Sequence, residues 1–157
     1  MVDIEARLGE SGIVLPAASA PSHSYVSARQ TGNLLYISGH VPKRDGQYPY
    51  LGKLGAGVTL EQAQECARIC VINGLASAKS YLGDLKRVTG VIKLVGYVAS
   101  APTFFEQPQV INAASNLLIE ALGEAGRHAR TSIGVAVLPN DVPVEIEMIL
   151  EIEGQAG

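Results

Sequence analysis

Charged side chains are scarce in this sequence. They make up 17% of its 157 residues, and 12 Lys and Arg stand against 15 Asp and Glu, which gives a formal net charge of −3. A nucleic-acid-binding protein usually carries a basic excess or a basic stripe, and this sequence has neither. We therefore expect no nucleic-acid partner. Few charges together with 47% hydrophobic residues instead suit a protein that buries apolar surface between subunits.

Cysteine and histidine are also rare, which limits disulfide and metal chemistry. Cys66 and Cys70 are four residues apart in a segment with helical periodicity, and two thiols alone make a poor metal site. We interpret them as small buried hydrophobic residues and expect no disulfide, in keeping with a reducing compartment. His23, His40 and His128 are too dispersed to predict a metal site. We expect neither a metal nor another cofactor.

Long apolar runs and several enzyme motifs are missing as well. No stretch approaches the roughly 18 apolar residues that span a bilayer, and the charged start MVDIEARLGESG lacks the apolar core of a signal peptide. We therefore expect a cytoplasmic protein with no membrane contact. The glycine-rich GKLGAG at 52–57 fits neither the Walker motif GxxxxGK[ST] nor the dinucleotide-binding motif GxGxxG. The serine-hydrolase motif GxSxG is also missing. We interpret 52–57 as a flexible loop.

The sequence does contain a regular succession of helix and strand patterns. A short amphipathic helix at 3–11 and a Pro/Ala/Ser-rich linker form an N-terminal extension (1–22) of one domain that spans residues 1–157. After a hairpin and a long loop at 41–58, helices and strands alternate. The predicted strands are 25–31, 33–39, 88–100, 130–138 and 144–153, and the main helices are 59–82 and about 105–125. This order predicts a two-layer α+β fold, with a mixed sheet and two main helices on one of its faces.

The last predicted strand has the clearest pattern in the chain. Its apolar residues alternate with glutamates, a pattern broken only by Ile149, so one face belongs to a core and the other meets something polar. The apolar set is Val144, Ile146, Met148, Leu150 and Ile152, and the acidic set is Glu145, Glu147, Glu151 and Glu153.

An arginine opens the strand before it. Arg130 shares one strand face with the small residues Ser132, Gly134 and Ala136, so there is room beside its guanidinium. A guanidinium in such a place is suited to gripping a carboxylate through two parallel hydrogen bonds. The alternative is an ion pair with a glutamate of the neighbouring strand, and the sequence favours neither.

A hairpin between the last two strands would constrain this site. It sets Arg130 opposite residue 152, beside Glu151 or Glu153, and about 20 Å from Glu145. If Arg130 and Glu145 serve one site, we predict that different subunits supply them.

Three stretches together resemble a known family. They are YVSARQTGNLLYISGHVP (25–42), VIKLVGYVAS (91–100) and ARTSIGVAVLPNDVPVEIEMI (129–149). They are similar to the RidA/YjgF family of reactive intermediate deaminases, known in older naming as endoribonuclease L-PSP or translation-inhibitor proteins. The resemblance covers about residues 24 to 153. It implies a chorismate-mutase-like two-layer fold and a homotrimer with ligand clefts between its subunits.

The resemblance also implies functional residues. In the deaminating members, the arginine that matches Arg130 grips the carboxylate of a 2-imino or enamino acid. The glutamate that matches Glu145 positions or activates the water that releases ammonia. The matching substrate-binding positions are Tyr25, Ser38, Gly39, Asn112 and Ser132.

The function that we expect is therefore hydrolysis of small imine or enamine carboxylates to keto acids and ammonia, without a cofactor. A trimer that binds small carboxylate metabolites without turnover is the alternative, and an endoribonuclease is a further one. The sequence departs from the best-known members at His23-Ser24, where they have Gly-Pro, and at Ser132, where they often have Cys. These departures, with the N-terminal extension and the 41–58 loop, point to a distinct, longer branch.

Overall fold

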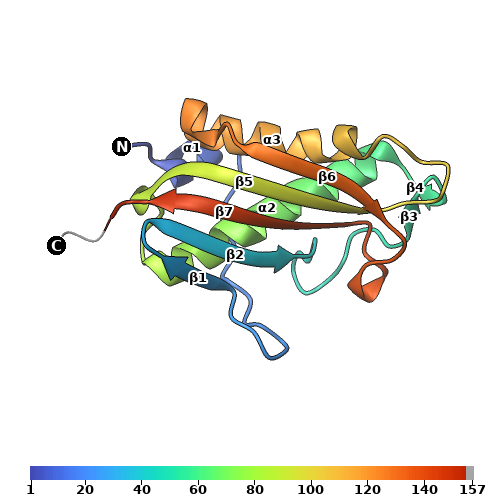
Figure 1. Cartoon of the computed structure of the whole chain (residues 1–157), viewed down its shortest axis with the longest axis horizontal. Helices are drawn as coiled ribbons and strands as arrows, with labels where there is room; N and C mark the ends of the chain where they lie inside the picture. Colours follow the sequence, from blue (N-terminus) through green and yellow to red (C-terminus); the bar gives the residue numbers. More distant parts are fainter. Residues whose placement is uncertain (155–157) are drawn as a thin grey trace.

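A five-stranded mixed sheet forms the centre of the computed structural model, which describes residues 1–154. The strand order is β1-β2-β7-β5-β6 (Figure 1). Only β5 and β6 run parallel, and all other neighbours are antiparallel. The bounds are β1 (Ala28–Thr31), β2 (Leu34–His40), β5 (Val88–Ala99), β6 (Ala129–Val135) and β7 (Val144–Ile152).

Two long helices, α2 (Leu60–Leu82) and α3 (Gln107–Leu122), lie behind the sheet as Figure 1 presents it. The short helix α1 (Ile4–Glu10) packs on α3 and buries Ile4 and Leu8 almost completely. Three 3₁₀ turns complete the helical segments: η1 (Leu85–Arg87), η2 (Gly123–Gly126) and η3 (Pro139–Asp141). The predicted two-layer α+β architecture, with both main helices on one face, is confirmed.

Local signals explain where α2 begins and ends. Thr59 and Gln62 form a capping box, in which each side chain accepts a hydrogen bond from the other residue's backbone N–H. Gly83 ends the helix with a φ of 82°, a value that glycine adopts without steric cost. Between these ends, Cys66 and Cys70 are fully buried free thiols. Their interpretation as small core residues is confirmed.

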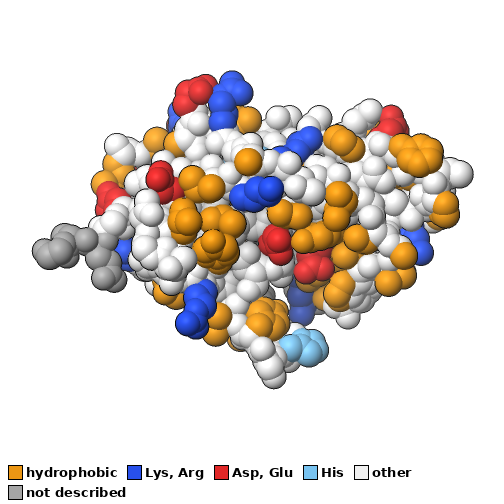
Figure 2. Space-filling model, viewed as in Figure 1, with side chains coloured by type: hydrophobic (Ala, Val, Ile, Leu, Met, Phe, Trp, Pro, Cys, Tyr) orange, Lys and Arg blue, Asp and Glu red, His pale blue; other side chains and the backbone are white. Residues whose placement is uncertain are grey.

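The faces of the sheet differ in character. The apolar side chains at every second position of β7, from Val144 to Ile152, point to the helices and are at most 2% exposed, whereas Ile149 lies on the other face and is partly exposed. The predicted alternation is confirmed. No described element covers the opposite face, where Tyr36 is 46% and Ile133 43% exposed. Figure 2 shows this open face, with apolar side chains spread between a few charged ones.

The predicted hairpin between the last two strands is wrong. β5 lies between β6 and β7, and Leu94 of β5 pairs with Arg130 on one side and Met148 on the other. Arg130 is therefore level with Met148 instead of residue 152. The eight residues between β6 and β7 (136–143) are enough for a hairpin, but β5 offers a buried apolar strand that pairs with both.

The loop at 41–58 contains more order than we expected. Lys53–Leu54 (β3) and Gly57–Val58 (β4) form a short parallel ladder, and the side chain of Leu54 is buried. The first strand begins later than predicted, at Ala28, so 25–27 precede the sheet. No helix among residues 1–154 is long and apolar enough to cross a bilayer.

Candidate active site

The predicted site residues form two groups that a single chain does not bring together. One group is the Arg130 cluster, which lies between β6 and α3. The other surrounds a pocket at the end of β2, which we call the Glu145 pocket. The first contains Arg130, Asn112 and Ser132, and the second contains Tyr25, Ser38, Gly39 and Glu145.

The guanidinium of Arg130 is held by neutral partners. Its Nη1 donates to Asn112 Oδ1 at 2.8 Å and to Ser115 Oγ at 3.2 Å. These two residues are three positions apart on α3 and therefore lie on the same helix face. Within residues 1–154, Arg130 forms no ion pair, so the alternative of an ion pair with a neighbouring glutamate is wrong. A guanidinium that is held by neutral partners keeps its charge available and is suited to binding a carboxylate.

Ser132 offers a second polar group on this side of the sheet. It follows Arg130 by two residues on β6, so both side chains leave the same strand face. Its Oγ is buried and has no hydrogen-bond partner among the described residues. Because an unpaired buried hydroxyl is costly, this position favours a ligand that supplies the missing bond.

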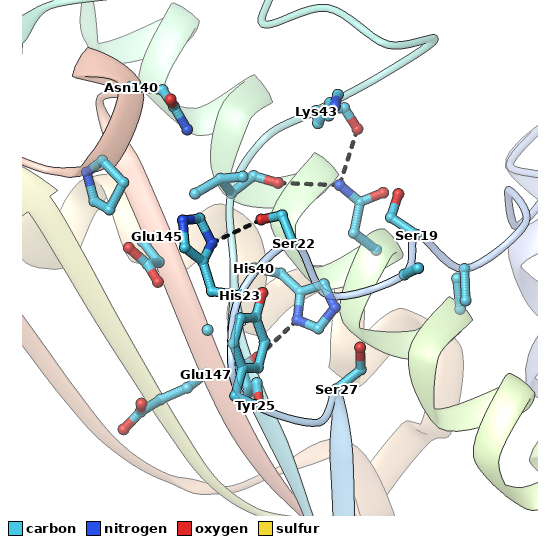
Figure 3. A pocket seen from close by; sticks show the side chains of 18 of the residues that line it. Ser19, Ser22, His23, Tyr25, Ser27, His40, Lys43, Asn140, Glu145 and Glu147 are labelled. Carbon is cyan, nitrogen blue, oxygen red and sulfur yellow. Dashed lines mark hydrogen bonds between the residues drawn. The ribbon is translucent and has the colours of Figure 1, made fainter.

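The Glu145 pocket has a volume of about 570 Å³ and is drawn in Figure 3. Segments far apart in the sequence line it: the linker from Ala17 to Tyr25, the end of β2, α2, the η3 turn and β7. His23, Tyr25, Glu145 and Glu147 are among its polar groups. The N-terminal extension is therefore a wall of this pocket.

A β-bulge places Glu145 beside a glycine. Ile37 of β2 pairs with Met148 and His40 pairs with Ile146, so β2 has one extra residue at this point. The bulge brings Gly39 against the Glu145 carboxylate, where a Cβ atom would collide with Oε1. Gly39 thus belongs to the site because it leaves room for the carboxylate.

The surroundings of Glu145 suit proton transfer. Burial of the carboxylate, and secondly the nearby charge of Glu147, raise the pKa of Glu145 above its ordinary value of 4.5. A raised pKa makes a carboxylate a better proton acceptor near neutral pH. Tyr97, which pairs with Glu145 across β5 and β7, donates a hydrogen bond to Glu147 at 3.3 Å.

Ser38 and His40 hold the backbone of the pocket. The Ser38 hydroxyl donates to the Val26 carbonyl at 2.6 Å, which fixes the segment that carries Tyr25. The Ser38 carbonyl accepts a hydrogen bond from His40 Nδ1 at 2.7 Å, and His40 Nε2 contacts Ser77 Oγ at 2.8 Å. The Ser38 hydroxyl therefore bonds to the backbone of its own chain. The side chain of Tyr25 remains 49% exposed.

Sequence reasoning missed several residues of both groups. Ser115 could have been found from its spacing to Asn112 on one helix face, and His128 from its position two residues before Arg130. Asn140 carried no such signal. It adopts a φ of 57° in the η3 turn at the pocket rim and donates to Tyr48 of the 41–58 loop at 3.1 Å.

Metal-ligating side chains do not converge in the described part of the chain. Within residues 1–154, no three His, Cys, Asp or Glu side chains are grouped so that they could hold a metal ion. The chemistry available to the site is that of a guanidinium, carboxylates, hydroxyls and imidazoles.

The structure thus combines a two-layer α+β fold, with the helices on one face of a mixed sheet, and a polar pocket at the edge of that sheet. Residues 5–152 match the family model described as "YjgF/chorismate mutase-like, putative endoribonuclease". The chain therefore belongs to the YjgF/RidA family.

Individual proteins of known sequence or structure agree with this assignment. Protein TCP17 of Trypanosoma cruzi is 43% identical over 150 residues, which are 95% of this chain and 94% of that protein. The crystal structure of Atu1372 from Agrobacterium tumefaciens, a protein of unknown function, is 48% identical, covers 96% of this chain and 92% of its own, and has a TM-score of 0.89. Escherichia coli TdcF, crystallised with bound serine, shares the fold at 23% identity and a TM-score of 0.64, over 87% of this chain and 94% of its own.

Proposed function

We propose that this protein is a hydrolytic deaminase of small 2-imino and 2-enamino acids, which converts them to 2-keto acids and ammonia. We further propose that it acts as a homotrimer in which Arg130 of one subunit and Glu145 of the next complete each site. The observation that carries this proposal is Arg130, a guanidinium positioned by neutral residues and left without an anion within residues 1–154.

Arg130 would bind the substrate carboxylate. Asn112 and Ser115 occupy Nη1, and the other guanidinium donors form an edge that fits both oxygens of a carboxylate. The unpaired Ser132 hydroxyl on the same strand face would add a hydrogen bond. The serine bound to TdcF is itself a small carboxylate held by a protein of this fold, which supports this class of ligand.

Glu145 would serve as the base. It takes a proton from a water molecule while the water oxygen attacks the carbon of the C=N bond, and it passes that proton to the imine nitrogen. It then takes the hydroxyl proton of the tetrahedral intermediate and gives it to the departing amine as the C–N bond breaks, so ammonia leaves and the carbonyl of the keto acid remains. One water is consumed for each ammonia released, and Glu145 ends as it began. The raised pKa of Glu145 matches this task, and general base catalysis contributes about 10²–10⁴-fold.

The positions of the two groups support the proposed assembly. Arg130 and Glu145 are two strands apart and three residues out of register, about 14 Å between their Cα atoms, and they leave opposite faces of the sheet. One chain therefore does not place both on one substrate. The open sheet face, with Tyr36 and Ile133 exposed, offers apolar surface on which further copies would pack.

The experiment is a deaminase assay with 2-iminobutyrate generated in place by an amino-acid oxidase. We expect the protein to accelerate ammonia release. The R130A variant should lower kcat/KM by about 10- to 150-fold, the equivalent of a lost charge-assisted hydrogen bond. The absence of acceleration with 2-iminobutyrate and 2-iminopropionate would contradict the proposal.

The alternative functions predict different results. A non-catalytic carboxylate-binding trimer would show a melting temperature raised by 2-oxobutyrate and no turnover. An endoribonuclease would show RNA cleavage that co-purifies with the protein and is lost in R130A.

A further inference from the structure

A chain of hydrogen bonds continues behind Arg130 and away from the substrate side. Arg130 Nη1 donates to Ser115 Oγ, and Ser115 Oγ lies 2.9 Å from His128 Nε2. His128 Nδ1 in turn lies 2.6 Å from the carbonyl oxygen of Gly126. His128 and Ser115 thus connect the guanidinium to the backbone at the end of α3.

Only one arrangement of protons satisfies this chain when His128 is neutral. A carbonyl oxygen only accepts, so the proton of His128 is on Nδ1 and Nε2 keeps its lone pair. Ser115 then donates its hydroxyl proton to Nε2, and its oxygen remains free to accept from Arg130. Burial, and to a smaller extent the positive charge of Arg130, lower the pKa of His128 and so favour the neutral form, although its bond to Gly126 opposes them.

The far end of the chain is fixed by backbone packing. A side chain at Gly126 would collide with the Leu118 carbonyl of α3, so the η2 turn lies directly on the helix. The Gly126 carbonyl therefore holds a set position relative to Ser115 and Asn112, which α3 also carries. Asn112 and Ser115 on α3, together with the Gly126 carbonyl that packs against it, therefore determine where Arg130 Nη1 lies.

We propose that His128 and Ser115 are positioning residues that orient the Arg130 guanidinium for the substrate carboxylate. This inference rests on the proposed function. The two protons of Nη1 are directed to Asn112 and Ser115, so the edge formed by Nε and Nη2 is presented to the ligand. Without His128 as acceptor, the Ser115 hydroxyl loses its fixed orientation, and Asn112 becomes the only partner of the guanidinium with a fixed orientation.

The test uses S115A, H128F and H128Q in the full-length protein. Since Arg130 binds the carboxylate in the ground state and in the transition state alike, S115A and H128F should raise KM for 2-iminobutyrate by about 3- to 10-fold, and kcat should stay within about 2-fold. In H128Q the amide oxygen takes the place of the Nε2 acceptor, so KM should return to near the wild-type value. S80A, on an exposed part of α2, is the matched control and should change neither constant.

Melting temperatures identify a variant that fails to fold. If H128F fails to fold, S115A and H128Q still test the positioning role. A fall in kcat at unchanged KM, or an H128Q variant as impaired as H128F, would overturn the proposal. Calorimetric titration with 2-oxobutyrate tests the positioning role of His128 and Ser115 separately from the deaminase hypothesis. If the wild type binds 2-oxobutyrate without turnover and the same variants weaken binding, the positioning role stands and the deaminase fails. If the wild type neither turns over nor binds, both are overturned.

Discussion

Arg130 and Glu145 belong to one sheet but leave it from opposite faces. Leu94 links Arg130 to Met148, whose side chain points to the helices, whereas Tyr97 links Ile133 to Glu145 on the open face. On the proposed function, a substrate that touches both residues lies between two copies of the chain.

This arrangement predicts that two impaired variants restore each other's activity when they are mixed. R130A keeps Glu145, and E145Q keeps Arg130, so a site formed between the two subunits contains both intact residues. Random mixing at equal amounts should make about one site in four intact. Each site takes Arg130 from one subunit and Glu145 from its neighbour, and each of these residues is intact in half of the chains. Refolding the mixed chains and measuring 2-iminobutyrate hydrolysis checks this.

Each variant refolded alone is the control and should keep only its own low activity. A mixture that is no more active than its components would show that the two residues act in one chain or in different sites.

Gly39 predicts a variant that loses activity but keeps its stability. In G39A the new methyl group occupies the space of Glu145 Oε1, and the flexible glutamate side chain moves away. We expect kcat to fall by at least about 10-fold, since a displaced base no longer meets the attacking water. The melting temperature should change little, because the collision is with the end of a side chain and not with backbone.

The double variant G39A/E145Q tests the cause. If the methyl group acts through Glu145, adding G39A to E145Q should cost almost nothing further. Additive losses would mean that Gly39 contacts the ligand directly.

The pH profile should depend on Glu147. Glu145 must be ionised to act as a base, so kcat/KM falls as the pH drops through its raised pKa. E147Q removes the second cause of that rise, and the acid limb of the profile should move to lower pH. E151Q is the control, because Glu151 contacts Asn33 and Thr89 and is no part of either site. An acid limb that moves equally in both variants would exclude a specific effect of Glu147.

His40 should make the folded state sensitive to acid. Burial lowers the pKa of His40 despite the bond to Ser38 that opposes it, so the unfolded chain binds a proton more readily than the folded one. The free energy of unfolding should therefore fall as the pH drops below about 6.5, by no more than about 1.4 kcal/mol per pH unit for this group. Urea unfolding at pH 5, 6 and 7 and fixed protein concentration measures it.

The H40Q variant is the comparison. Its unfolding free energy should vary less with pH over the same range, because it lacks the titrating group. His128 also has a lowered pKa, so some dependence should persist. An unchanged slope in H40Q would contradict the assignment.

Local patterns predicted most of the fold, and the long-range pairing of strands was beyond them. The capping box at Thr59 and the alternation along β7 depend on neighbouring residues, and the structure reproduces both. The position of β5 between β6 and β7 depends on which apolar strand pairs best with two others, and no local pattern encodes this choice.

The same distinction applies to the site. Residue type and strand face left two interpretations of Arg130 open, a carboxylate anchor and an ion pair with a neighbouring glutamate. The partners of Arg130, however, come from α3, and their choice over Glu151 follows from the sheet order. The bulge that brings Gly39 to Glu145 likewise depends on the pairing between β2 and β7.

The two cysteines predict how the native protein responds to thiol reagents. Burial raises the pKa of Cys66 to about 12 and that of Cys70 well above its ordinary value, and both side chains are fully covered. Since the thiolate is the reactive form, neither residue should react with a disulfide reagent at pH 8 in the native protein, and both should react in denaturant. An S80C variant, with its thiol on the exposed side of α2, should react with one equivalent per chain under native conditions and so confirm that the reagent is active. Rapid reaction of the wild-type protein would show that α2 opens from the sheet on the time scale of the assay.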